Sequence, residues 1–197
     1  MLEITIKLKR MKNIFILLTT TFLVITFSAQ TYPLRTYGIK YPANSYVQDT
    51  NNELLPFVGN WSGTWKNKTI YLYFKKIKYY ANYLGDRAYY ADIIVGNFKV
   101  IDNSTGQILF DNTSLPDNEI LIEGMKFKQN TNRYILSYND PSLCLSAFLY
   151  IRLTDPSNTK LEFQLSEIPG VIDKNCPYYN APEMPEPLPK NIILTKQ

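Results

Sequence analysis

The chain has 197 residues and no histidine, which restricts the side chains that could act in catalysis or bind a metal. This excludes Ser-His-Asp and Cys-His catalytic groups and every histidine-ligated metal site. Two carboxylates could still act as acid and base on a glycoside if they were held about 5–10 Å apart. No motif selects a pair among the available acidic residues, which include Asp86, Asp92, Glu123, Asp140 and Glu167. We therefore expect no catalytic residue, no metal site and no cofactor.

Cys144 and Cys176 are the only cysteines. In an exported chain, an even pair suggests one disulfide, and a bridge of this loop length would add about 2–4 kcal/mol of stability. The alternative is two buried free thiols. A redox pair is disfavoured because the two residues do not form a C-x-x-C motif.

Aromatic residues supply the candidate binding surfaces. Trp61 and Trp65 are four residues apart and so share one face of a regular strand, where they would form either a platform for a sugar or lipid or part of the core. The 16 tyrosines suit carbohydrate or peptide recognition, but they equally suit the wet face of a sheet. The candidates for ligand binding are Trp61, Trp65, Tyr71, Tyr73, Tyr134 and Tyr138. A cluster of tyrosines around residues 84–87 is a further candidate.

The segment Lys75-Lys76-Ile77-Lys78-Tyr79-Tyr80 interleaves charge with aromatic rings, as the groove of a single-strand nucleic-acid binder does. An exported protein rarely meets nucleic acid, and the end of a strand commonly carries solvated charge. We therefore interpret these lysines as a strand end and expect no nucleic-acid partner.

The elements that would position these residues are strands. Alternation of apolar and polar residues predicts strands over 69–75, 148–153 and 161–166, after a first strand that opens at Phe57-Val58-Gly59-Asn60-Trp61. Further β-branched or aromatic runs cover residues 89–101, 107–110, 119–127, 133–138 and 191–195.

Short polar turns separate these runs, which favours an all-β, antiparallel up-and-down meander of eight or nine strands. Parallel pairing would need long crossovers, and we expect none. Such a meander resolves its unpaired edges best by closing into a barrel, and a two-sheet β-sandwich is the alternative. Five prolines in 177–189 predict an extended strap before the final strand at 191–195.

The first 29 residues are typical of a secretory signal. An apolar run at 14–27 follows a basic segment and is too short to span a membrane, and we expect the true start to be Met11. Cleavage would follow Ser28 or Ala29. Residues 30–56 then form a Tyr- and Pro-rich leader with one short helical turn at 52–55, and 57–197 form a single domain. We expect a monomer that is periplasmic or secreted, with no transmembrane span in the mature chain.

Export also changes the charge of the protein. The full chain carries 21 basic and 17 acidic residues. Removal of residues 1–29 takes away four basic residues and one acidic residue, which leaves 17 and 16. The apparent basicity therefore belongs to the signal and indicates no anionic partner.

The Gly59-x-Trp61 motif at the mouth of the first strand, after a short helical turn, resembles the opening of lipocalins. That resemblance implies an eight-stranded barrel in which Trp61 plugs one end. The chain departs from the family because Thr154-Asp155 is followed by Pro156 rather than an aromatic residue. No arginine near the last strand is clearly the one that would stack on the tryptophan.

The order of Asn51-Asn52-Glu53-Leu54, Phe57-Val58-Gly59-x-Trp61 and the closing 193–197 resembles a family of small exported flavobacterial proteins, classed as a domain of unknown function. The resemblance implies export and a β-rich fold, and it carries no activity or site residue.

Two functions remain as hypotheses. The first is a non-catalytic exported barrel that binds a small apolar or amphipathic ligand. The alternative is a cell-envelope interaction module that recognises glycan or protein through its tyrosine-rich surface.

Overall fold

The computed structural model describes residues 30–82, 88–168 and 174–197. The predicted signal at 1–29 and residues 83–87, at the centre of the candidate tyrosine cluster around residues 84–87, lie outside this part of the chain. The strands are β1 (Thr31–Pro33), β2 (Tyr46–Gln48), β3 (Gly59–Trp65), β4 (Lys68–Ala81), β5 (Tyr89–Asp102), β6 (Ile108–Asp111), β7 (Ile122–Phe127), β8 (Tyr134–Asp140), β9 (Leu145–Leu153), β10 (Lys160–Glu167) and β11 (Asn191–Lys196). One 3₁₀ turn, η1 (Leu55–Phe57), precedes β3.

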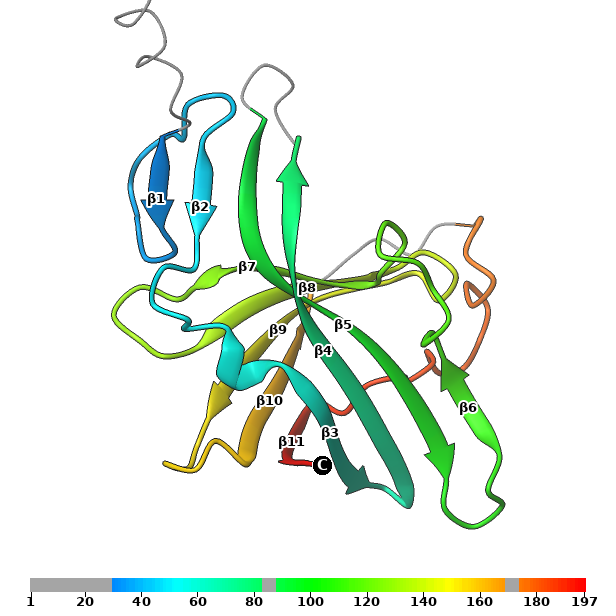
Figure 1. Ribbon diagram of the computed structural model, residues 1–197. Helices are drawn as coiled ribbons and strands as arrows, with labels where there is room; N and C mark the ends of the chain where they lie inside the picture. The colour runs from blue at the N-terminus through cyan, green and yellow to red at the C-terminus, as the bar shows by residue number, and fades with distance from the viewer. Residues whose placement is uncertain (1–29, 83–87, 169–173) are drawn as a thin grey trace, which may run out of the picture.

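Eight of these strands close into an antiparallel barrel (Figure 1). They follow the order β3-β4-β5-β7-β8-β9-β10-β11, and β11 returns to pair with β3 through Thr195 opposite Ser62. Each barrel strand pairs with the next barrel strand along the chain. The strand β6, which lies between β5 and β7 in the sequence, is outside the ring and pairs with β5. The predicted all-β meander and its closure into a barrel are therefore confirmed, and the sandwich alternative is not adopted.

The strand alternation that the sequence shows decides what the barrel encloses. In β4, Ile70, Leu72 and Phe74 point inward and are buried, whereas Tyr71 between them is exposed. The inward positions of the other barrel strands contribute Leu, Ile, Val and Phe to one continuous core. Burial of this apolar surface is the main stabilising term of the fold.

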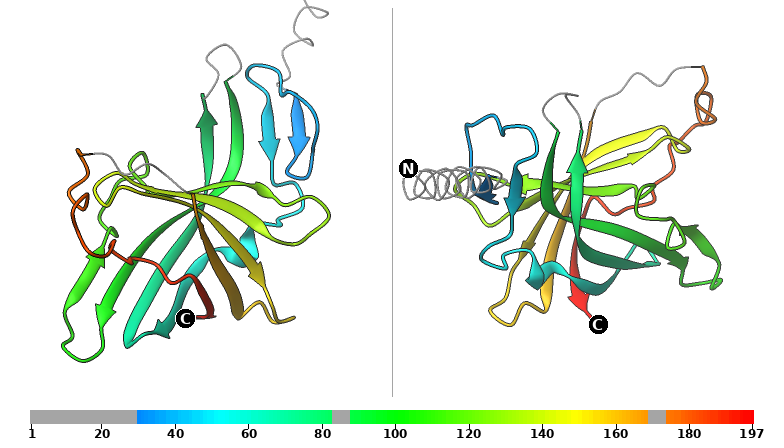
Figure 2. Two further views of the ribbon diagram at one scale, coloured as in Figure 1. Left: turned by 180° about the vertical axis from the view of Figure 1, so that it is seen from behind. Right: turned by 45° about the horizontal axis from the view of Figure 1, so that its top comes forward.

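The two ends of the barrel differ. At one end, η1 and the start of β3 place Leu54, Phe57 and Trp61 in the core, so this end is plugged. At the other end lies the strap (177–189), which leads into β11, and its Leu188 also belongs to the core. Two further views show the strap, in orange and red, passing across the barrel to the final strand (Figure 2).

A sheet extension rises beyond the barrel. β4 and β5 pair over their whole length, from Lys68 opposite Asp102 to Ala81 opposite Tyr89, but β3 pairs with β4 only as far as Phe74. The free half of this long hairpin carries the leader, because β2 pairs with β5 and β1 pairs with β2. A second, smaller core of Val47, Ala91, Ile93 and Val95 lies on one face of the extension.

Three expectations need correction here. The β1–β2 and β2–β5 pairs are parallel, which was not expected. The intervening segment 34–45 supplies the return that a parallel pair requires. The helical turn is at Leu55–Phe57 rather than 52–55 and includes Pro56, which the first turn of a helix tolerates. Lys75, Lys76 and Lys78 do not end a strand, because β4 continues through them to Ala81.

In the described residues, the only helical element is this 3₁₀ turn, and no helix is long and apolar enough to cross a bilayer.

Candidate ligand-binding site

The open end of the barrel holds a cavity with a volume of about 970 Å³. Its wall comes from the end of β8, the β8–β9 turn, the start of β9 and the end of β10. The strap forms the remaining side, from Glu183 to Leu188. Strands that alternate inward and outward must expose their last inward side chains here, where the core ends and no further strand covers them.

The floor of this cavity is apolar. Leu145, Ala147 and Leu165 are inward positions of β9 and β10, and Leu188 reaches the same space from the strap. Tyr138 of β8 adds an aromatic ring that is itself 1% exposed. An apolar floor of this kind favours the hydrocarbon part of a ligand.

Polar groups at the floor are held by their own turn. The Tyr138 hydroxyl donates to Asp140 Oδ2 at 3.1 Å. The other oxygen of Asp140 accepts from the Ser142 amide and hydroxyl and from the Leu143 amide. Burial, with the neighbouring Asp140 carboxylate, raises the pKa of Tyr138, so its hydroxyl stays protonated and remains a donor. Asp140 therefore acts as the cap of the β8–β9 turn.

The rim of the cavity is charged and mostly acidic. Lys66 Nζ pairs with Glu186 of the strap at 2.9 Å, and Lys190 Nζ pairs with Glu167 at 3.4 Å. Together with Asp140 and Glu183, the lining carries four carboxylates and two ammonium groups. The balance of charge around the opening is therefore negative.

The disulfide lies at the same opening. Cys144 and Cys176 are bonded, as the sequence predicted, and both line the cavity. The bridge ties the beginning of the strap to the β8–β9 turn, while β11 fixes the other end of the strap. Cys144 has a positive φ of 55°, which the tight turn after Pro141 imposes.

The opposite, plugged end is built around Trp61. Its indole Nε1 donates to the Phe57 carbonyl at 2.8 Å, and the residue is 0% exposed. In lipocalins an arginine would stack on this tryptophan, and here a lysine takes that place. Lys196 Nζ lies 5.2 Å from the Trp61 ring centroid and donates to the Pro56 carbonyl at 3.1 Å. Lys196 is the penultimate residue of the chain, and only the closing of β11 onto β3 brings it here.

The structure separates the aromatic residues that the sequence proposed as a binding surface. Trp61, Tyr134 and Tyr138 are buried in the barrel, and Trp65 is half-buried and packs against the same core. Tyr71 and Tyr73 alternate with the inward residues of β4 and so lie on the outer face. Of the six candidates, only Tyr138 lines the open cavity.

One buried polar cluster could not be predicted from the sequence, because its three charged residues are far apart along the chain. Asp49 and Asp92 are both buried, and Lys76 Nζ lies 3.2 Å from Asp49 and 3.7 Å from Asp92. Asp49 also accepts from the Glu53 and Leu54 amides, and Asp92 accepts from the Tyr46 hydroxyl and the Asp49 amide. Every carboxylate oxygen has a donor, so this cluster joins the leader to the β4–β5 hairpin.

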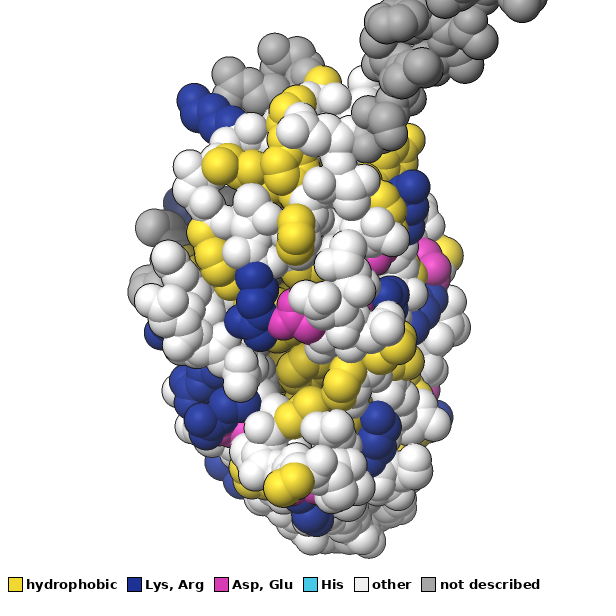
Figure 3. All heavy atoms as spheres, turned by 60° about the vertical axis from the view of Figure 1, so that its left-hand side comes forward, with side chains coloured by type: hydrophobic (Ala, Val, Ile, Leu, Met, Phe, Trp, Pro, Cys, Tyr) yellow, Lys and Arg dark blue, Asp and Glu magenta, His cyan; other side chains and the backbone are white. Residues whose placement is uncertain are grey.

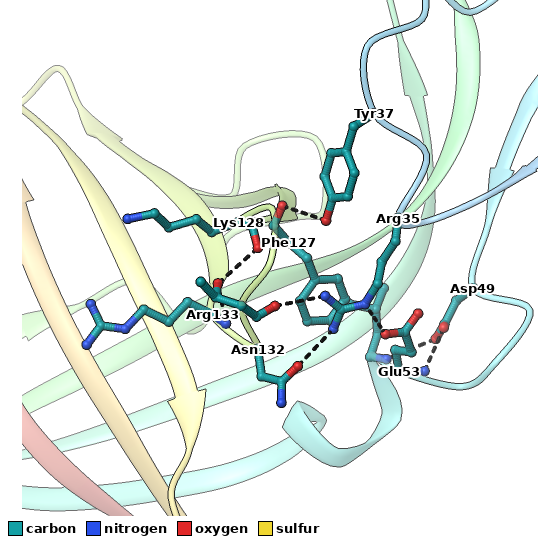
Figure 4. A network of polar contacts seen from close by, with 10 residues as sticks. Arg35, Tyr37, Asp49, Glu53, Phe127, Lys128, Asn132 and Arg133 are labelled. Carbon is teal, nitrogen blue, oxygen red and sulfur yellow. Dashed lines mark hydrogen bonds and ion pairs between the residues drawn. The ribbon is translucent and has the colours of Figure 1, made fainter.

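A second contact of the leader reaches the turn between β7 and β8 (Figure 4). The Arg35 guanidinium lies 4.1 Å above the Phe127 ring, donates to the Thr131 carbonyl at 2.8 Å and pairs with Glu53. The Tyr37 hydroxyl donates to the Phe127 carbonyl in the same region. The leader is therefore an integral part of the fold.

The described residues contain no group of three or more His, Cys, Asp or Glu side chains that could hold a metal ion. Among the carboxylates considered for glycoside chemistry, Asp92 lies at the extension and Asp140 at the open end of the barrel. Asp86 falls outside the described part of the chain.

Fold and site together define a class of protein: a small antiparallel β-barrel of eight strands with one plugged end and one open end that holds a cavity. Within that class, this chain belongs to the family of unknown function DUF6705, whose model matches residues 11–197. No curated protein and no solved structure matches the chain.

Proposed function

We propose that this protein is an exported, non-catalytic, monomeric barrel that binds a small apolar or amphipathic molecule in its open end. The observation that carries the proposal is the cavity of about 970 Å³ beneath the strap, where the inward side chains Leu145 and Leu165 line open space. Its volume falls within the range of about 300–1,000 Å³ that is usual for small-molecule sites.

The lining favours a particular kind of ligand. Leu145, Ala147, Leu165 and Leu188 would contact a hydrocarbon or ring system. The polar end of the ligand would lie at the rim, where three glutamates outnumber two lysines: Glu167, Glu183 and Glu186 against Lys66 and Lys190. Coulombic repulsion would disfavour an anionic head there, so we expect a neutral or cationic one.

Export has independent support. A disulfide persists in oxidising compartments, and the bridge here is built into the fold. The family match begins at Met11, the residue that the signal pattern favours as the start. The absence of histidine from the sequence supports a binding role over a catalytic one.

Calorimetric titration with two amphiphiles of equal chain length tests the proposal. We expect decylammonium to bind the wild-type protein and decanoate to bind more weakly. Leu145→Trp, which fills the cavity, should abolish binding, whereas Ile108→Trp on exposed β6 should not change it. Undiminished binding by Leu145→Trp, or no heat with either amphiphile, would contradict the proposal.

The alternative role, recognition of an envelope glycan or protein through tyrosines, would use a different surface. Tyr80 and Tyr90 lie on the sheet extension outside the barrel, and they are 48% and 38% exposed.

A further inference from the structure

The sheet extension has two faces that differ in what covers them. One face packs Val47, Ala91, Ile93 and Val95 against Leu34 and Tyr41 of the leader. The opposite face carries the other set of alternating residues, which are Tyr80 and Lys78 of β4, Tyr90 of β5 and Tyr46 of β2. This second face is an aromatic surface supported from behind by a core.

Three tyrosines on this face form a row across adjacent strands. Tyr80 is opposite Tyr90 in the β4–β5 ladder, and Tyr90 is opposite Tyr46 in the β5–β2 ladder. The Tyr80 and Tyr90 ring centroids are 5.1 Å apart. Strands in a sheet repeat at about 4.8 Å, so the row presents one ring per strand at intervals close to the length of a sugar unit.

A lysine ammonium is held over this row. Lys78 Nζ lies 4.3 Å from the Tyr46 ring centroid and 4.6 Å from that of Tyr90. No carboxylate of the described residues lies within ion-pair distance of Lys78, whereas Lys75 pairs with Asp117 and Lys76 with Asp49. The row therefore carries one cation that is available to a ligand.

The surface is ordered before any ligand arrives. The Tyr46 hydroxyl donates to Asp92 at 2.6 Å, and burial together with this bond raises the pKa of Tyr46 to about 12, so the donor is kept. Two ring faces fix the position of the Lys78 ammonium. A ligand would therefore lose little affinity to the ordering of these side chains.

We propose that the row Tyr80-Tyr90-Tyr46 with Lys78 binds an acidic polysaccharide: sugar rings stack on the tyrosines, and a uronate carboxylate pairs with the Lys78 ammonium. Amphipathic tyrosine rings provide both an apolar face and a polar edge, which suits sugars. Single-stranded nucleic acid also stacks on aromatic rings, but its binding depends on several phosphate contacts, and among the described residues of this face Lys78 is the one lysine without an ion pair. The leader side of the molecule, to which β2 belongs, shows hydrophobic and basic side chains with fewer acidic ones (Figure 3).

Binding to immobilised polygalacturonate, measured by biolayer interferometry, tests this site. We expect Tyr80→Ala, Tyr90→Ala and Lys78→Gln each to weaken binding about tenfold, the effect of losing one well-packed contact. Tyr71→Ala is the matched control, because Tyr71 lies on β4 and is 36% exposed, close to the 38% of Tyr90. Leu145→Trp should bind as the wild type does, because this site is separate from the barrel cavity.

Fully methyl-esterified polygalacturonate, which lacks the charge, should bind more weakly than the acid form, and Lys78→Gln should remove that difference. Equal binding of the two polymers by the wild type would overturn the assignment of Lys78. Equal loss in Tyr71→Ala, or no binding of polygalacturonate, would overturn the site itself. Tighter binding of an oligodeoxythymidine, lost in the same variants, would assign the row to nucleic acid instead.

Discussion

At the scale of single residues, the buried carboxylates Asp49 and Asp92 share one lysine. Asp49 has no exposed side-chain surface and Asp92 only 8%, whereas Lys76 is 25% exposed. Two buried negative charges close together are tolerated because the Lys76 ammonium and four further hydrogen-bond donors surround them. The cluster therefore depends on Lys76 more than the exposure of this lysine suggests.

Replacing this lysine gives the first prediction. Lys76→Ala leaves two buried carboxylates without their cation and should lower the free energy of unfolding by about 3 kcal/mol. Lys75→Ala is the control, because the adjacent pair with Asp117 is exposed and should contribute less than about 1 kcal/mol. Urea unfolding followed by circular dichroism measures both, and equal losses in the two variants would contradict this role of Lys76.

The plugged end gives a second prediction at this scale. Lys196→Ala removes the cation over Trp61 and the bond to the Pro56 carbonyl, and it should cost about 1–2 kcal/mol. Lys196→Arg should retain most of the stability, since a guanidinium can make both contacts. Lys160→Ala, which loses only an exposed bond to Thr195, is the comparison. If Lys196→Arg were as unstable as Lys196→Ala, the cation would not be the feature that matters.

At the scale of elements, the strap is fixed by different kinds of contact. The disulfide holds its beginning, Leu188 inserts into the core near its end, and Lys66–Glu186 joins its middle to the β3–β4 turn. The ion pair is exposed and therefore weak, so the covalent bond and the apolar contact must dominate.

Removing the disulfide tests whether it holds the strap more strongly than the Lys66–Glu186 ion pair does. Cys144→Ser combined with Cys176→Ser should lower the free energy of unfolding by about 2–4 kcal/mol. It should also increase the rate at which a protease cleaves the strap in the folded protein. Lys66→Gln should change neither quantity appreciably. A strap that stays equally resistant without the disulfide would show that Leu188 alone is sufficient.

The sequence determines some of these elements more clearly than others. Ile70, Leu72 and Phe74 alternate so regularly that the strand and its inward face follow from them, and the number of such strands with short turns favoured a barrel over a sandwich. The cysteine pair, together with the export signal, favoured a bridge over two free thiols. The leader could not be placed, because Tyr-Pro pairs and turns hide two three-residue strands without alternation. The second half of β4 was missed because Lys76 looks solvated in sequence, while its partner Asp49 is 27 residues away. The open cavity depends on which strand ends the strap covers, and no local pattern encodes that.

At the scale of the whole molecule, buried tyrosines lower the free energy of unfolding as the pH becomes alkaline. Burial raises the pKa values of Tyr134 and Tyr138 above the ordinary value of 10.0. Above about pH 10 the unfolded chain loses these protons while the folded chain keeps them, so the unfolded state binds fewer protons and stability falls as pH rises. Below pH 10 both states are protonated, and this contribution is fully present.

The free energy of unfolding should therefore fall above pH 10 by about 1.4 kcal/mol per pH unit for each of these tyrosines. Guanidinium unfolding titrations at intervals between about pH 8 and about pH 12 would measure the slope. Tyr134→Phe should reduce it by the share of one tyrosine. An unchanged slope in that variant would mean that Tyr134 ionises equally in both states.

The central claim is that the open end of the barrel holds a small molecule. Native mass spectrometry of the protein purified from its own cells tests it most directly. We predict an added mass of a few hundred daltons on the wild-type protein that is missing from Leu145→Trp and present on Ile108→Trp. A wild-type protein that carries no added mass, or an added mass that Leu145→Trp retains, would contradict the claim.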